Sequence, residues 1–136
     1  NMLDDFDERN IPIDGIGLQM HISTEYPKNS TIEKAVDLFV ERGLKIHFSE
    51  IDIRVNPNGN AETFTQDLAE EQFWKTKAIT EIYNSIPSDQ QAGMTLWGLR
   101  DNQSWVLGHW GNVDWPLFFD EKYDRKLAHQ GFLQAL

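Results

Sequence analysis

The 136-residue sequence predicts an α/β fold in which three parallel strands alternate with helices. Three β-rich segments, near residues 13–21, 45–55 and 93–99, are separated by helical patterns. Polar or aromatic side chains gather at the carboxyl end of each segment, as in the active site of a (β/α)₈ barrel. A complete barrel takes about 250 residues, so we expect a partial TIM barrel: its last three β/α units, with the first five missing.

The first two units are defined by turn and capping residues. The first strand follows a turn at residues 12–15, and residues 30–33 (Ser-Thr-Ile-Glu) form a capping box that predicts the start of a helix. Gly43 is a typical helix stop, and the second strand follows it. This order predicts a right-handed crossover between parallel strands.

The third unit begins after the turn-rich segment 56–60. Apolar residues at three- and four-residue spacing predict a helix over about residues 65–85, followed by the third strand. We expect residues 100–123 to form a long loop, which its aromatic content makes a functional rather than a disordered one. A last helix is predicted over about residues 125–136.

Composition excludes several classes of protein. The formal net charge is −10 without a cluster of basic residues, so neither nucleic acid nor a membrane surface is an expected partner. The absence of cysteine excludes disulfides and thiolate chemistry. No signal peptide is evident, but the first residues resemble the end of a helix, so the chain looks cut and a lost targeting signal is not excluded.

Glu50 and Asp52 are the strongest candidates for catalytic residues. They lie two residues apart in an apolar strand, and this spacing places them on one face. His21, on the neighbouring strand, can hydrogen-bond Glu50 and be oriented by Asp52, and Gln19 shares its face. Two alternatives stay open: a buried ion network with Arg54, and a metal site formed by His21, Glu50, Asp52 and His109.

Tryptophans give the second signal, because four of the five lie between residues 97 and 115. Indole faces stack on the apolar faces of sugar rings, and we place Trp97 and Trp105 at a sugar. The alternative is that these rings fill the mouth of the barrel. Asp101 and Ser104, between them, are expected to fix the loop through hydrogen bonds.

The sequence resembles glycoside hydrolase family 10, the endo-1,4-β-xylanases. Three blocks carry the resemblance: residues 13–21 (IDGIGLQMH), 46–53 (IHFSEIDI) and 96–105 (LWGLRDNQSW), which look like strands six, seven and eight of that barrel. Residues 116–120 and the closing helix also fit. The resemblance implies a TIM barrel of which residues 1–136 form the C-terminal portion.

The resemblance also implies roles for single residues. Glu50 looks like the catalytic nucleophile, supported by His21 and Asp52. The residues that look like substrate-binding groups are Gln19, His21, Trp97 and Trp105. It implies no cofactor and no metal, xylan or xylo-oligosaccharide as the partner, and a secreted or periplasmic location.

One required group is missing. Retaining glycosidases use a second carboxyl group as acid/base, which in this family lies in an Asn-Glu pair, and the sequence has no such pair. We therefore expect the chain alone to be inactive. An open three-strand sheet also leaves two edges and one face without neighbours, so we expect the chain to need the N-terminal half of the barrel or self-association for stability. Alternatives are a retaining barrel enzyme acting on another β-glycan, and a non-catalytic carbohydrate-binding fragment.

Overall fold

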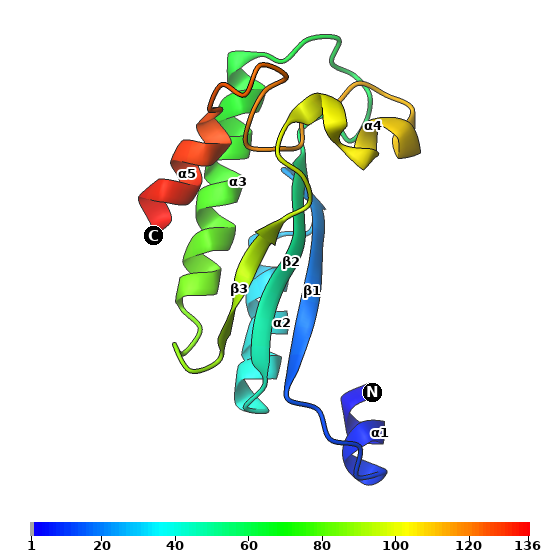
Figure 1. Cartoon of the computed structure of the whole chain (residues 1–136), viewed down its shortest axis with the longest axis vertical. Coiled ribbons are helices and arrows are strands. Elements are labelled where there is room, and N and C mark those ends of the chain that lie inside the picture. Colours follow the sequence, from blue (N-terminus) through cyan, green and yellow to red (C-terminus); the bar gives the residue numbers. More distant parts are fainter. Residues whose placement is uncertain (1) are drawn as a thin grey trace.

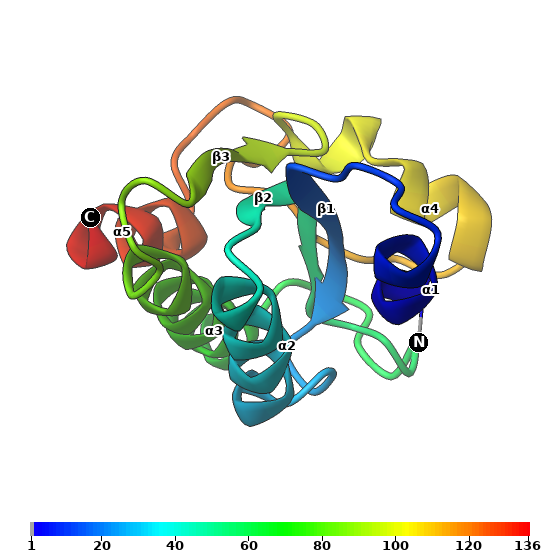
Figure 2. The same ribbon diagram turned by 90° about the horizontal axis from the view of Figure 1, so that it is seen from below.

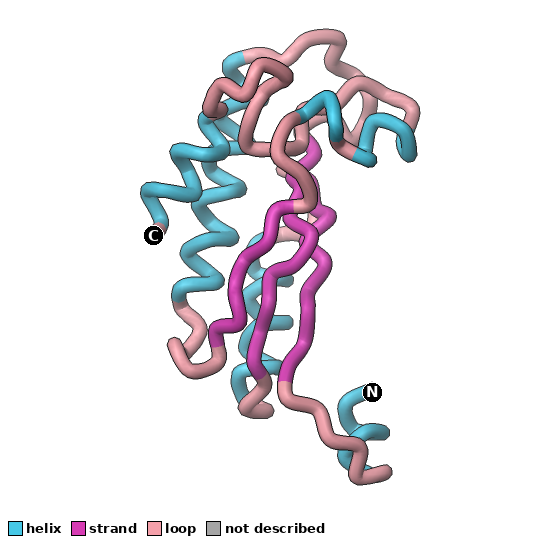
Figure 3. Tube along the Cα trace, viewed as in Figure 1, coloured by secondary structure: helices cyan, strands magenta, loops and turns pink. Residues whose placement is uncertain are grey.

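The computed structural model describes residues 2–136 and contains a parallel three-strand sheet in the order β1-β2-β3 (Figure 1). The strands are β1 (Gly15–Ser23), β2 (Lys45–Arg54) and β3 (Gln91–Leu96). They point the same way, and the loops that follow them gather at one edge of the sheet (Figure 3). This arrangement confirms the predicted α/β fold of three units of a TIM barrel.

Helices cover one face of the sheet. Figure 2 shows α2 (Asn29–Glu41) and α3 (Gln66–Asn84) against that face, with α5 (Leu127–Ala135) packed beside α3. The short helix α1 (Met2–Glu8) precedes β1. No helix in the described part of the chain is both long and apolar enough to cross a membrane.

The helix ends test the sequence patterns. Thr65 caps α3, its side chain accepting a hydrogen bond from the Leu68 backbone N–H at 3.3 Å, close to the predicted start. Gly43 follows α2 with φ of 71°, as expected of a helix stop. The capping box predicted at residues 30–33 is wrong, because α2 begins at Asn29 and no side chain caps it.

The predicted loop 100–123 is more ordered than its sequence suggests. It contains a 3₁₀ turn, Asp101–Gln103, and the helix α4 (Trp105–Trp110). The Ser104 side chain caps α4 by accepting a hydrogen bond from the Val106 N–H at 3.3 Å. A buried ion pair of 2.9 Å between Lys126 and Asp101 ties this segment to the start of α5, so both expected loop-fixing residues have that role.

A bulge in β2 changes the direction of its side chains. In the pairing of β1 with β2, Gln19 lies opposite Ser49. His21 follows Gln19 by two residues, but its partner Asp52 follows Ser49 by three. The pairing with β3 contains the same additional residue. Glu50 lies there with φ of 55°, in the left-handed region.

Glu50 and Asp52 share a face, as predicted, but the bulge and not the regular alternation of the strand determines which face it is. Regular alternation would place Glu50 and Asp52 on the face of Phe48, which is fully buried in the core. Instead Ile51 and Ile53 continue the core face after the bulge. Glu50 and Asp52 both lie on the opposite face because of the additional residue.

The core lies between the sheet and the α2–α3 layer. Each strand contributes alternate apolar side chains to it, and β2 contributes the most deeply buried ones. The buried or partly buried members from the strands are Ile16, Leu18, Met20, Ile22, Ile46, Phe48, Ile51, Ile53, Met94 and Leu96.

Candidate active site

The carboxylate of Glu50 is held by two donors from β1. Gln19 Nε2 donates to Oε1 at 2.8 Å, and His21 Nε2 lies 3.0 Å from Oε2. The Glu50 side chain keeps 21% of its surface exposed. Both oxygens are therefore fixed in direction while the carboxylate still faces solvent, which suits a group that must meet a substrate.

His21 links Glu50 to a second, buried carboxylate. Its Nδ1 atom lies 2.9 Å from Oδ2 of Asp52, which is 1% exposed. His21 thus has one ring nitrogen within hydrogen-bond distance of each carboxylate. The ring is thereby fixed in plane and orientation by Asp52 on one side and Glu50 on the other.

Burial raises the pKa of Asp52, while hydrogen bonds from Trp105 and His21 act in the opposite direction. The Trp105 Nε1–H donates to Oδ2 at 2.7 Å, and Oδ1 has no hydrogen-bond partner among residues 2–136. Asp52 thus depends on one oxygen for both contacts. It connects the cleft wall to the histidine and does not reach the surface itself.

Two indole rings, Trp97 and Trp105, lie beside His21. Trp97 follows β3, and its backbone N–H donates to the Ile51 carbonyl at 3.0 Å, which places it beside the bulge. The ring centroids of Trp97 and Trp105 lie 6.2 and 4.9 Å from that of His21, in edge-on arrangements. Trp97 is 47% exposed and Trp105 is 38% exposed, so both offer surface to a ligand.

The structure therefore brings together all the site residues singled out from the sequence, and it adds others. A pocket of about 280 Å³ beside His21 is also lined by Tyr26, Arg54 and Trp110. Tyr26 is 75% exposed, just after the end of β1. Sequence reasoning did not place Tyr26 and Trp110 at the site because their positions depend on loop conformation, although an aromatic residue shortly after a strand end is a usable signal.

The residues on which the two alternative interpretations depend, Arg54 and His109, have other partners. Arg54 Nε bonds Asp114 at 3.1 Å instead of Glu50 or Asp52. His109 packs against Trp105, with ring centroids 4.9 Å apart. Residues 2–136 contain no group of three His, Cys, Asp or Glu side chains placed to hold a metal ion.

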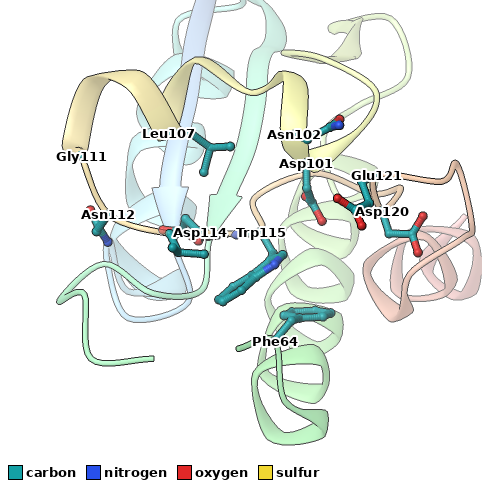
Figure 4. A pocket seen from close by; sticks show the side chains of 11 residues that line it. Phe64, Asp101, Asn102, Leu107, Gly111, Asn112, Asp114, Trp115, Asp120 and Glu121 are labelled. Carbon is teal, nitrogen blue, oxygen red and sulfur yellow. Dashed lines mark hydrogen bonds between the residues drawn. The ribbon is translucent and has the colours of Figure 1, made fainter. Parts of the chain in front are cut away.

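A second pocket, of about 590 Å³, lies below α4 (Figure 4). Figure 4 shows Trp115 and Phe64 along one wall, with ring centroids 5.5 Å apart. Its buried acids have structural partners: Asp101 bonds Lys126 and the Leu117 N–H, and burial raises the pKa of Asp101. We assign this pocket no chemistry.

Comparison with known proteins gives a consistent result. A family model described as glycosyl hydrolase family 10 matches residues 1–135. The endo-beta-1,4-xylanase Xyn10C of Cellvibrio japonicus is 32% identical over 150 residues, covering 100% of this chain and 25% of the relative. Endo-1,4-beta-xylanase A of the same species (strain Ueda107) is 35% identical, covering 93% of this chain and 23% of the relative. The chain thus spans about a quarter of these relatives.

Solved structures agree with the fold. A variant of xylanase 10C from Cellvibrio japonicus in complex with xylopentaose superposes with a TM-score of 0.93 at 32% identity, covering 98% of this chain and 29% of that one. The catalytic core of a xylanase A gives a TM-score of 0.89 at 30% identity, covering 99% and 43%. The family match extends over nearly the whole chain, so the protein belongs to glycosyl hydrolase family 10.

Proposed function

We propose that residues 1–136 are the C-terminal portion of a retaining endo-1,4-β-xylanase barrel, with Glu50 as its nucleophile. The observation that carries the proposal is the Glu50 carboxylate, held by Gln19 and His21 at the bulge of β2. His21 and Asp52 orient this carboxylate. Gln19, His21, Trp97 and Trp105 form the walls of the subsite for the sugar that is cleaved.

The proposed chemistry has two displacements. An oxygen of Glu50 attacks the anomeric carbon as the bond to the leaving sugar breaks, and a general acid protonates the leaving oxygen. Water, deprotonated by the same group, then attacks the glycosyl–Glu50 ester and releases the sugar. The contacts of Gln19 and His21 with the two carboxylate oxygens hold Glu50 in the orientation that the first step needs.

The general acid is the group that the site does not offer. Retaining enzymes place two carboxyl groups about 5–5.5 Å apart. Asp52 shares His21 with Glu50, but it is 1% exposed and engaged by Trp105, so it cannot reach a leaving oxygen. We therefore infer that the acid comes from outside these 136 residues, from the N-terminal half of a barrel.

The substrate class follows from the relatives. A related xylanase 10C has been solved in complex with xylopentaose, which supports a xylo-oligosaccharide as ligand for this chain. The aromatic and amide groups around Glu50 suit such a neutral sugar. Xylan, the polymer built from such sugars, is too large to pass a membrane, which supports a secreted or periplasmic location for this protein.

A chimera tests the proposal. Residues 1–136 replace the matching segment in the catalytic core of a xylanase A, and release of reducing ends from xylan is measured. Glu50→Gln should abolish turnover, while Glu41→Gln, an exposed glutamate at the end of α2, should retain it. Full activity of the Glu50→Gln chimera would end the case for this nucleophile.

Chemical rescue makes the test specific to the role of Glu50. In Glu50→Ala, azide can occupy the emptied space and attack the anomeric carbon directly, giving a product of inverted configuration. Rescue of this kind is expected only where the missing group was the nucleophile. The chain alone should hydrolyse at least about 10²-fold more slowly than the chimera, the lower range for a lost general acid.

A further inference from the structure

Trp74 lies on the outer surface of α3, although its place inside a helix suggests core packing. Its side chain is 63% exposed. The Phe73 ring packs edge-on against it, with centroids 5.0 Å apart at 87°. An indole costs free energy when it is left in water. Trp74 therefore offers an exposed apolar surface outside the active site.

Trp74 borders a polar pocket of about 600 Å³ between α3 and the segment that joins β1 to α2. The base of this pocket includes Lys75, which is only 6% exposed. Its Nζ atom donates to the Pro27 carbonyl and to Asn29 Oδ1, and no carboxylate of residues 2–136 pairs with it. Burial lowers the pKa of Lys75. The ammonium has three N–H donors, so it has hydrogen-bonding capacity left for a ligand.

The charges around the pocket balance. Two lysines and two glutamates line it together with uncharged donors and acceptors; these charged residues are Glu25, Lys28, Glu71 and Lys75. This balance favours a neutral ligand over an anion. Hydroxyl-binding groups beside one exposed indole match a sugar, which has an apolar ring face and a polar edge.

The pocket lies close to the cleft along the chain. Ser23 and Tyr26 line the pocket at His21, whereas Thr24, Glu25 and Lys28 line the one at Trp74. One short segment, residues 23–28, thus contributes to both. A glycan bound at Trp74 would be retained near the cleft.

We propose that the Trp74 pocket is a second binding site for the xylan backbone, outside the catalytic cleft. The proposal rests on the proposed function only for the identity of the polymer. The indole of Trp74 stacks on a sugar ring, while Lys75 and Glu71 bond its hydroxyls. The site holds the polymer near the cleft and does no chemistry.

Affinity electrophoresis of the 136-residue chain through gels with and without soluble xylan tests this site. The cleft is first weakened with Trp97→Ala, so that the remaining retardation reports binding elsewhere. Adding Trp74→Ala should reduce that retardation roughly two- to tenfold, the range for one aromatic contact, and Trp74→Phe should restore part of it. Leu133→Ala removes another exposed apolar side chain, on α5, and is the matched control.

Three outcomes would overturn the proposal: retardation that vanishes with Trp97→Ala alone, retardation unchanged by Trp74→Ala, or an equal loss in Leu133→Ala. Circular dichroism of each variant checks that the helices are intact. The two proposals fail independently. An active Glu50→Gln chimera would refute the role of Glu50 as nucleophile but would not affect the proposed binding at Trp74. Unchanged retardation in Trp74→Ala would refute the binding site but would not affect the proposed role of Glu50.

Discussion

Replacing Trp105 by Phe tests the hydrogen bond between the cleft wall and the buried carboxylate. The Trp105 N–H donates to Oδ2 of Asp52 at 2.7 Å, and Oδ1 has no partner among residues 2–136. Phenylalanine keeps an aromatic ring but has no donor, so Asp52 retains only its contact with His21. A hydrogen bond to a charged group contributes about 1.5–3 kcal/mol, and we expect Trp105→Phe to lower the free energy of unfolding by about that amount.

A second substitution separates the hydrogen bond from the change in ring packing. In an Asp52→Asn background the acceptor is neutral, and such a bond contributes about 0.5–1.5 kcal/mol. Trp105→Phe should therefore cost roughly 1 kcal/mol less there than in the parent chain. Trp110→Phe is the control: Trp110 stacks with Arg54, 4.6 Å from its ring centroid, and should show no coupling to Asp52.

Urea unfolding followed by circular dichroism gives each free energy. All variants are compared at one protein concentration, because association of chains would add a concentration-dependent contribution to stability. An equal cost of Trp105→Phe in both backgrounds would refute the reasoning, since the indole would then act through packing alone. Coupling of the same size in Trp110→Phe would refute it as well.

Three further predictions concern stability. Burial raises the pKa of Asp52, so the folded chain binds this proton more tightly than the unfolded chain. Its contribution to stability is complete below the ordinary carboxyl range and is lost as the pH rises through the raised pKa; Asp52→Asn should remove that loss from the pH profile of the unfolding free energy. Gly131→Ala should destabilise the chain although alanine favours helices, because its Cβ would lie 2.5 Å from the Phe73 carbonyl oxygen, whereas Gly108→Ala, with nothing within 4 Å, should stabilise it by up to about 1 kcal/mol. Thermal unfolding compares the two, and the same sign for both would contradict the packing argument. Asp114→Ala leaves an arginine and three backbone N–H groups without their acceptor and should cost about 3–5 kcal/mol in urea unfolding, against a smaller loss in Asp114→Asn, which keeps an acceptor oxygen; equal costs would show that the acceptor oxygen kept in Asp114→Asn contributes nothing and would contradict this reasoning.

Regular periodicity made most of the fold predictable. The helix expected over residues 65–85 is found as Gln66–Asn84, because a long apolar pattern with capping residues leaves little choice of boundary. Helix α4 was not predicted, since its six residues, Trp105–Trp110, are too few to show a period. The capping box predicted at residues 30–33 is not formed, although the residue pattern fitted, because the helix already begins at Asn29.

The site was partly predictable for a similar reason. Side chains at the carboxyl ends of adjacent parallel strands must come together, so Gln19, His21 and Glu50 could be placed at one edge from the sequence. The contacts of His21 with Glu50 and Asp52 were expected and are present. The hydrogen bond from Trp105 to Asp52 was not expected, and neither were the loop residues Tyr26 and Trp110, which depend on the path of irregular backbone. The catalytic roles remain predictions, because proximity is compatible with more than one chemistry.

The bulge explains why Glu50 and Asp52 can act together. Without it, Glu50 would point into the apolar core beside Phe48, where an ionised carboxylate has no solvent and no partner. The bulge requires φ of 55° at Glu50, a conformation that costs a non-glycine residue about 1–2 kcal/mol. The hydrogen bonds from Gln19 and His21 to its carboxylate exist only in the bulged form, and they offset that cost. The strained backbone and the two donors therefore form one unit, in which the contacts that aim the carboxylate also stabilise the conformation that presents it.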